Sequence, residues 1–104
     1  MILTTTSSVS GKSVKQTLGL VKGSSARARH VGRDIMAVAK NIVGGEVSEY
    51  TQLIGESRQQ ALDRMIAEAE KSGANAIIGM RFSSSAISQG VSEILAYGTA
   101  VIVE

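Results

Sequence analysis

A chain of 104 residues supplies enough apolar side chains for one hydrophobic core and too few for two, so we expect a single domain over residues 1–104. With 43% hydrophobic and 19% charged residues it has a globular composition, and no stretch approaches the roughly 18 apolar residues of a membrane span. A net charge of +2, two tyrosines and one phenylalanine argue against nucleic acid as a partner.

The first residues, Met1-Ile2-Leu3-Thr4, lack the basic residues and the long apolar run of a signal peptide. The expected compartment is therefore the cytoplasm. The absence of cysteine excludes disulfides, thiolate metal sites and cysteine nucleophiles together.

Two extended segments are predicted in the first third of the chain. Polar and apolar residues alternate over Val14–Val21, which indicates a strand. Gly23-Ser24-Ser25 has the chemistry of a turn and predicts an interruption there. The following residues, Ala26–His30, fit either a second extended segment or a loop, and we treat them as extended.

Two helices follow. Helical spacing of apolar residues predicts the first over Arg33–Val43, with Gly44-Gly45 able to end it. The second is longer, beginning at Ser48, a residue type that favours a helix N-cap, and reaching Gly73. Gly55 lies inside this second pattern and predicts a kink or a break.

The C-terminal third has the period of two that is typical of strands. The first of these strands starts at Ala76, and its alternation places Ala76, Ile78, Met80 and Phe82 on one face. Ser88-Gln89-Gly90 predicts a turn, and Val91–Val103 predicts the second strand of a hairpin. The expected fold is α+β: a small antiparallel sheet packed on two helices, in the order β-β-α-α-β-β.

The last strand has apolar or small residues on both faces from Leu95 to Val103. Two helices can cover one face of the sheet, and a chain of this length has little left for the other. A partner subunit is the simplest cover, because apolar area left in water forfeits roughly 25 cal/mol per Å². We therefore expect a homo-oligomer, with long neighbouring side chains over a modest apolar surface as the alternative.

Two segments in the C-terminal half, Gly73–Phe82 and Glu93–Val101, resemble the YbjQ family of small prokaryotic proteins. The resemblance extends to Gly19–Gly23, Asn41–Glu46 and other short matches, so it covers nearly the whole chain. It implies a subunit fold related to dodecin, a cyclic pentamer, and a family described as heavy-metal-binding. This sequence departs from the family at Ser83-Ser84-Ser85, where an acidic residue is often found.

A metal site in this chain has few donors to draw on. Soft metals favour thiolate or imidazole, and the chain has no cysteine and one histidine. His30 and Asp34 are spaced i, i+4 if the first helix begins early, and could bind a divalent metal around a symmetric ring. The alternative is an exposed histidine before a helix and an aspartate near its positive end.

Six polar residues stand at positions that match the family. They combine both signs of charge with two phenols, and they are Glu46, Tyr50, Arg58, Arg81, Glu93 and Tyr97. They could line one pocket for a small anion, because arginine offers a planar fork to carboxylate or phosphate. Alternatively, Arg81 and Glu93 pair across the hairpin and organise an interface.

The sequence thus predicts a homo-oligomeric, pentameric module that binds a small ligand or a metal. A scaffold oligomer without a ligand is the first alternative. An enzyme that uses Glu46 and Tyr50 for proton transfer is the second, and we favour a non-enzymatic role.

Overall fold

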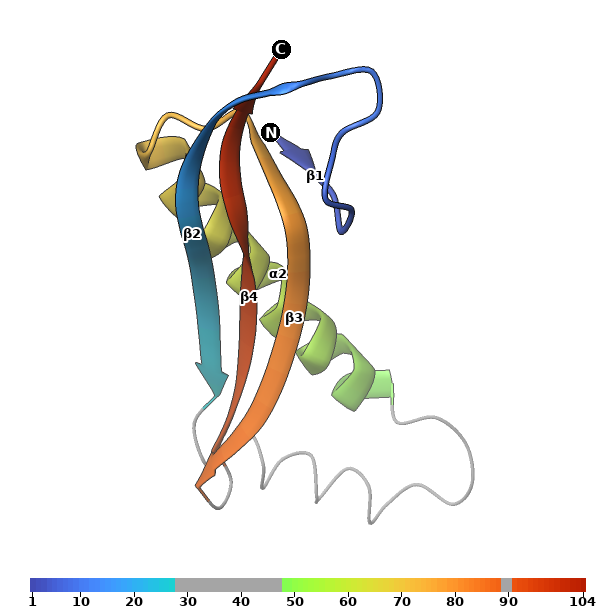
Figure 1. Cartoon of the computed structure of the whole chain (residues 1–104). Helices are drawn as coiled ribbons and strands as arrows, with labels where there is room; N and C mark the ends of the chain where they lie inside the picture. Colours follow the sequence, from blue (N-terminus) through green and yellow to red (C-terminus); the bar gives the residue numbers. More distant parts are fainter. Residues whose placement is uncertain (28–47, 89–90) are drawn as a thin grey trace.

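The computed structural model describes residues 1–27, 48–88 and 91–104. It contains β1 (Ile2–Leu3), β2 (Val14–Arg27), α2 (Ser48–Lys71), β3 (Ala76–Ser88) and β4 (Val91–Val103). The four strands form one sheet in the order β1-β3-β4-β2, and α2 lies along one face of it (Figure 1). The predicted α+β class is confirmed. The predicted helix over Arg33–Val43 lies outside the described residues.

The sheet is mixed, so the prediction of a purely antiparallel sheet is wrong. β4 is the central strand and pairs antiparallel with both β2 and β3, as the predicted hairpin requires. The short strand β1 adds to the outer edge of β3 in parallel, with Ile2 opposite Ala76 and Leu3 opposite Ile77. Two residues are too few for a periodic pattern, which is why this strand escaped the sequence analysis.

β2 runs without interruption through Gly23-Ser24-Ser25, so the predicted turn there is wrong. The glycine is required for a different reason. A Cβ atom on Gly23 would lie 2.3 Å from the Ala61 carbonyl oxygen and 2.3 Å from the Met65 amide nitrogen. The strand and the helix backbone therefore meet at this glycine, and Ser25 next to it donates a hydrogen bond of 3.0 Å from Oγ to Oε1 of Gln60.

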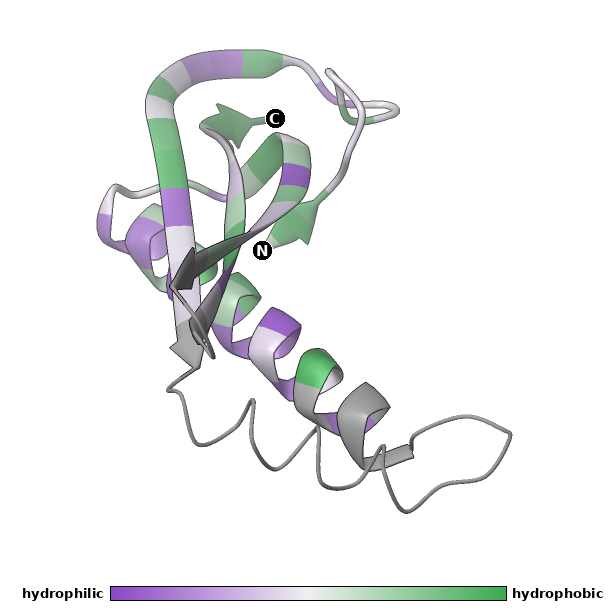
Figure 2. Cartoon of the chain, turned by 90° about the horizontal axis from the view of Figure 1, so that it is seen from below, coloured by the Kyte–Doolittle hydropathy of each residue, from purple (hydrophilic) through white to green (hydrophobic). Residues whose placement is uncertain are grey.

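α2 is continuous from Ser48 to Lys71, with no break at Gly55. It ends at Lys71, two residues before the predicted end at Gly73, and Gly73 has a φ of 90° and donates its N–H to Glu70 O while the Ala74 N–H donates to Ala69 O. Hydrophobic and hydrophilic residues alternate along the helix (Figure 2). No helix in the described part of the chain is long and apolar enough to cross a membrane.

The main hydrophobic core lies between α2 and the sheet. Its buried members are Val21, Ala61, Met65, Ala69, Ile77, Met80, Ala96 and Ala100. The helix packs chiefly on β2 and then on β4, the two strands that lie beneath it. Small residues on β4 allow this close approach, since Ala96 and Ala100 are both fully buried.

The face assignment predicted for β3 is wrong. The ladder with β4 shifts register between Ile78 and Arg81, where Gly79 has a φ of 61°. This bulge lets Ile77 and Met80 both enter the core, although strict alternation would have placed them on opposite faces. After the bulge, Arg81 lies on the face opposite α2.

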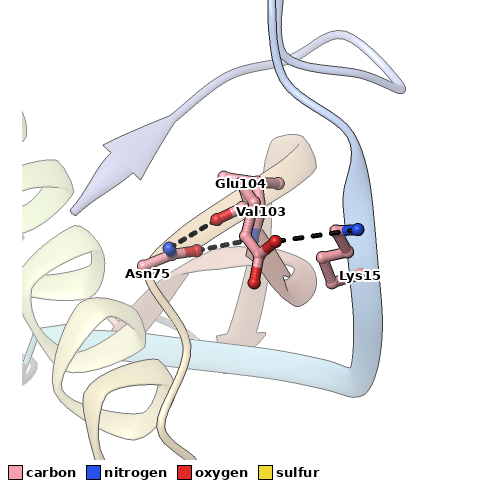
Figure 3. Close-up of polar contacts among 4 residues, drawn as sticks. All are labelled: Lys15, Asn75, Val103 and Glu104. Atoms are coloured by element: carbon pink, nitrogen blue, oxygen red, sulfur yellow. Dashed lines mark hydrogen bonds and ion pairs between the residues drawn. The ribbon is translucent and has the colours of Figure 1, made fainter.

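The N-terminal segment covers one end of the face opposite α2. A second cluster of buried residues, Ala76, Val101 and Val103, packs there against Ile2, Val9 and Ile78. The same end is closed by Asn75, whose Nδ2 donates to Val103 O at 2.9 Å and whose Oδ1 accepts from Val103 N–H at 2.8 Å (Figure 3). Thus the chain itself covers part of the doubly apolar strand.

Candidate functional site

The rest of the face opposite α2 is open in the described part of the chain. Leu20 on β2 stands 67% exposed in the middle of a long strand, and Tyr97 on β4 is 36% exposed. Leu95 and Thr99, which flank Tyr97 on the same face, are half-buried. We call this surface, made of residues 20, 22, 81, 95, 97 and 99, the open face.

The centre of the open face is a row of three residues across three strands. The register places Lys22 of β2 opposite Tyr97 of β4, and Tyr97 opposite Arg81 of β3. Residues directly opposite on neighbouring strands share a face of the sheet, so a phenol lies between two cations. Strands are spaced about 4.8 Å apart, which puts the Lys22 and Arg81 backbones about 10 Å from one another.

Arg81 also holds the N-terminal segment. Its Nη1 donates to Thr5 O at 2.8 Å and to Met80 O at 2.8 Å. The same segment is fixed along β3 by backbone hydrogen bonds, from Gly79 N–H to Thr6 O at 2.8 Å and from Met80 N–H to Thr4 O at 3.0 Å. One end of the guanidinium is therefore anchored on the protein backbone.

The predicted pair between Arg81 and Glu93 is not formed across the strands. Glu93 lies opposite Ser85 and Ala26, four residues along β4 from Tyr97, the partner of Arg81. Four residues of a strand span about 13 Å. Glu93 shares the open side of the sheet but not the central row.

Of the other predicted ligand residues, Arg58 is described, and it does not join the central row. Arg58 is exposed on α2, and the sheet separates that helix from the open face. The backbone of Tyr50 belongs to the first turn of α2, and its side chain is outside the described residues. Glu46 also lies outside them, so the proton-transfer pair of Glu46 and Tyr50 stays a prediction.

The described residues contain no group of three histidine, cysteine, aspartate or glutamate side chains that could hold a metal ion. His30 and Asp34, the predicted metal ligands, lie outside the described residues. The donor set that the structure does describe therefore does not fit a metal centre.

A shallow depression lies along one flank of α2, and the sequence analysis did not anticipate it. Its lining residues are Glu56, Gln59, Gln60, Asp63, Arg64 and Ala67. Several of these side chains already have partners: Gln60 accepts from Ser25, Gln59 Nε2 donates to Asp63 at 2.8 Å, and Arg64 donates to Ser24 O. The contacts of Gln60 and Arg64 attach α2 to β2, that of Gln59 lies within α2, and we assign the depression a structural role.

Lys22 is the functional candidate that sequence reasoning missed. Its place in the alternation of β2 was visible, but its neighbours were not, because they depend on the register of two other strands. The bulge at Gly79 decides which face Arg81 takes, and only the three-dimensional structure reveals it.

A family model called YbjQ, with the description "Putative heavy-metal-binding", matches residues 1–104. The chain belongs to this family. Among its YbjQ-family relatives, a UPF0145 protein of Dehalococcoides mccartyi is 58% identical over 104 residues, which is 100% of both chains. A UPF0145 protein of Methanosarcina acetivorans is 46% identical over 101 residues, covering 97% of this chain and 95% of that one.

The fold of this YbjQ-family chain is also found in a crystal structure. A Pediococcus pentosaceus protein of unknown function, described as a member of the DUF74 family, superposes with a TM-score of 0.65. The match covers 100% of this chain and 98% of that one at 15% sequence identity. At this identity the likeness shows the fold and nothing more.

Proposed function

We propose that this chain is the subunit of a homo-oligomer that binds a small anionic ligand. The pentameric ring implied by the family resemblance is the assembly we expect. The main support for the assembly is the outer edge of β3, which continues beyond the N-terminal segment without the charged residues or proline that usually protect a strand edge. Within the described residues, nothing pairs with its outer side from Phe82 to Ser88.

That edge has the composition of a contact surface. The segment Phe82–Ser88 reads FSSSAIS and contains no charged residue and no proline, the two devices that normally protect exposed strand edges. Phe82 itself is 46% exposed. Its side of the sheet is the one that carries α2, but α2 packs chiefly over β2 and β4, and within the described residues it leaves Phe82 partly exposed.

A second open edge lies on the opposite side of the sheet. β2 is the other terminal strand, and it runs for 14 residues. Because β2 and β3 are both antiparallel to β4, they run parallel to one another, so β3 of one subunit can pair with β2 of the next in the same orientation. Head-to-tail contacts of this kind close into rings when the rotation between subunits allows it.

The ligand part of the proposal favours an anion over a metal. Two unpaired cations stand at the centre of the open face, whereas the described residues offer no metal-ligand cluster. A metal site at His30 and Asp34 stays a prediction, and the heavy-metal-binding description of the family is its main support.

A scaffold oligomer without a ligand is the second candidate. The hydrogen bonds of Arg81 to Thr5 O and Met80 O favour it, because they give this arginine a structural role that needs no ligand. The two candidates share the same assembly and differ only in the occupancy of the open face.

Native mass spectrometry of the purified protein tests the assembly. We expect a ring of about five subunits for the unmodified chain and smaller species for Phe82→Lys, which places a charge in the proposed contact. Ala67→Lys is the matched control, since Ala67 is exposed on α2 and belongs to neither of the two strand edges. A monomer for the unmodified chain, or a ring that Phe82→Lys leaves intact, would overturn the proposed assembly.

A further inference from the structure

The open face has uncompensated positive charge at its centre. The described residues form one ion pair, between Lys15 and Glu104 at 3.6 Å. Lys15 lies near the start of β2, so this pair is at a distance from Lys22 and Arg81. The rows on either side of Lys22 and Arg81 contain only serine, threonine and aliphatic residues. Within the described parts of the sheet, the nearest carboxylate on this face is that of Glu93, two rows away.

Arg81 keeps N–H donors for an anion in addition to those that anchor it to the described residues. Its Nη1 makes both of the hydrogen bonds that anchor it, to Thr5 O and Met80 O. A guanidinium has five N–H donors, so the donors of Nη2 and Nε remain as a planar fork suited to carboxylate or phosphate. Anchoring through Nη1 reduces the conformational entropy that binding would otherwise cost.

The surroundings of the row are apolar. Tyr97 lies between the two cations, Leu20 is 67% exposed in the adjacent row, and Leu95 is half-buried in the row on the other side. An inorganic anion would leave these side chains in water. A ligand that combines an anionic group with a flat apolar ring would cover them and could stack on the phenol.

We propose that Lys22, Tyr97 and Arg81 form a binding site for a small aromatic anion. Arg81 binds the phosphate or carboxylate group through its free fork, Lys22 adds a second charge from β2, and the aromatic ring lies on Tyr97 and Leu20. This site deepens the ligand-binding part of the proposed function and rests on it.

A second copy of the chain is a weaker occupant for this face. The proposed subunit contact uses the strand edges and the α2 side of Phe82, which leaves the open face available. Nucleic acid is weaker still, because the net charge is +2 and the row offers two cations and one phenol.

Phenyl phosphate is a suitable probe, with inorganic phosphate and phenol as its two halves. We expect titration of the full-length ¹⁵N-labelled protein to shift the amide signals of β2, β3 and β4 around Lys22, Tyr97 and Arg81. Phenyl phosphate should bind about tenfold more tightly than inorganic phosphate, since ring burial adds apolar contact. Phenol should bind weakly.

Two variants of matched charge decide whether the site is specific. Lys22→Gln removes a charge-assisted hydrogen bond and should weaken phenyl phosphate at least about tenfold. Lys15→Gln removes the same charge from the same strand, outside the row, and should change binding less than about twofold. Arg81→Lys keeps the charge but loses the fork, and should also weaken binding.

The outcomes separate this site from the assembly. Equal effects of Lys22→Gln and Lys15→Gln would overturn the site, because binding would then follow net charge alone. A ring without phenyl phosphate binding would also overturn the site while the assembly stands, and so would burial of the open face by another subunit. Specific binding by a monomer would support the site and overturn the ring.

Discussion

Replacing Gly23 by alanine tests how closely α2 packs on the sheet. The added Cβ would lie 2.3 Å from Ala61 O and 2.3 Å from Met65 N, whereas ordinary contacts begin near 3.4 Å. Both atoms belong to the helix backbone, which cannot move aside as a flexible side chain can. The helix would have to shift by about 1 Å along the strand that it contacts most.

The expected cost follows from that shift. Overpacking a core typically costs about 1–3 kcal/mol, and a clash between two backbones belongs at the upper end, so we expect a loss of about 3 kcal/mol. For a domain of this size such a loss lowers Tm by roughly 10–20 °C. Urea denaturation followed by circular dichroism would measure it, at one fixed protomer concentration because the proposed assembly would also contribute to stability.

Gly55→Ala is the control for the same substitution. Gly55 lies within α2, and no described atom comes within 4 Å of its added Cβ. Alanine has the higher helix propensity, so this change should stabilise the protein by up to about 1 kcal/mol. If Gly23→Ala proved as stable as the unmodified chain, the close contact between α2 and β2 would be refuted.

Two further substitutions probe the end of the sheet shown in Figure 3. Asn75→Ala removes the partners of both backbone polar groups of Val103, so we expect a loss of about 2 kcal/mol in urea denaturation and faster amide exchange at Val103; an unchanged exchange rate would contradict this role. Lys15→Ala removes an ion pair whose side chains are 56% and 68% exposed, so stability should change by less than about 0.5 kcal/mol, and a loss above 1 kcal/mol would show that the pair with Glu104 is more than a surface contact.

Long periodic segments were predictable from the sequence, and short or irregular ones were not. α2 and the β3–β4 hairpin were found because their apolar periods extend over many residues. β1 has two residues, and its pairing with β3 depends on a contact between segments more than 70 positions apart. The turn predicted at Gly23 was wrong because glycine is common in turns, whereas here it allows the backbones of β2 and α2 to pack closely.

The candidate site was predictable in its residue types and not in its geometry. Arg81 and Tyr97 were selected from the sequence, and the structure places them opposite one another. Strict alternation from Ala76 would also have put Arg81 on the helix side together with Ile77, had the bulge at Gly79 not intervened. Lys22 became a candidate only when the register placed it across from Tyr97.

The sequence and the structure point to different surfaces for contact with a partner subunit. From the sequence it rested on the last strand, which is apolar on both faces and was expected to need a partner subunit. In the structure, α2 covers one face, and the chain's own N-terminal segment covers Val101 and Val103 on the other. The surface that we propose for a partner subunit therefore moves from β4 to the outer edge of β3, where Phe82 is exposed and the segment Phe82–Ser88 has no charged residue. The proposed assembly by strand edges would leave the open face accessible, so we expect the proposed ring and the proposed ligand site to use different surfaces and to be lost separately by mutation.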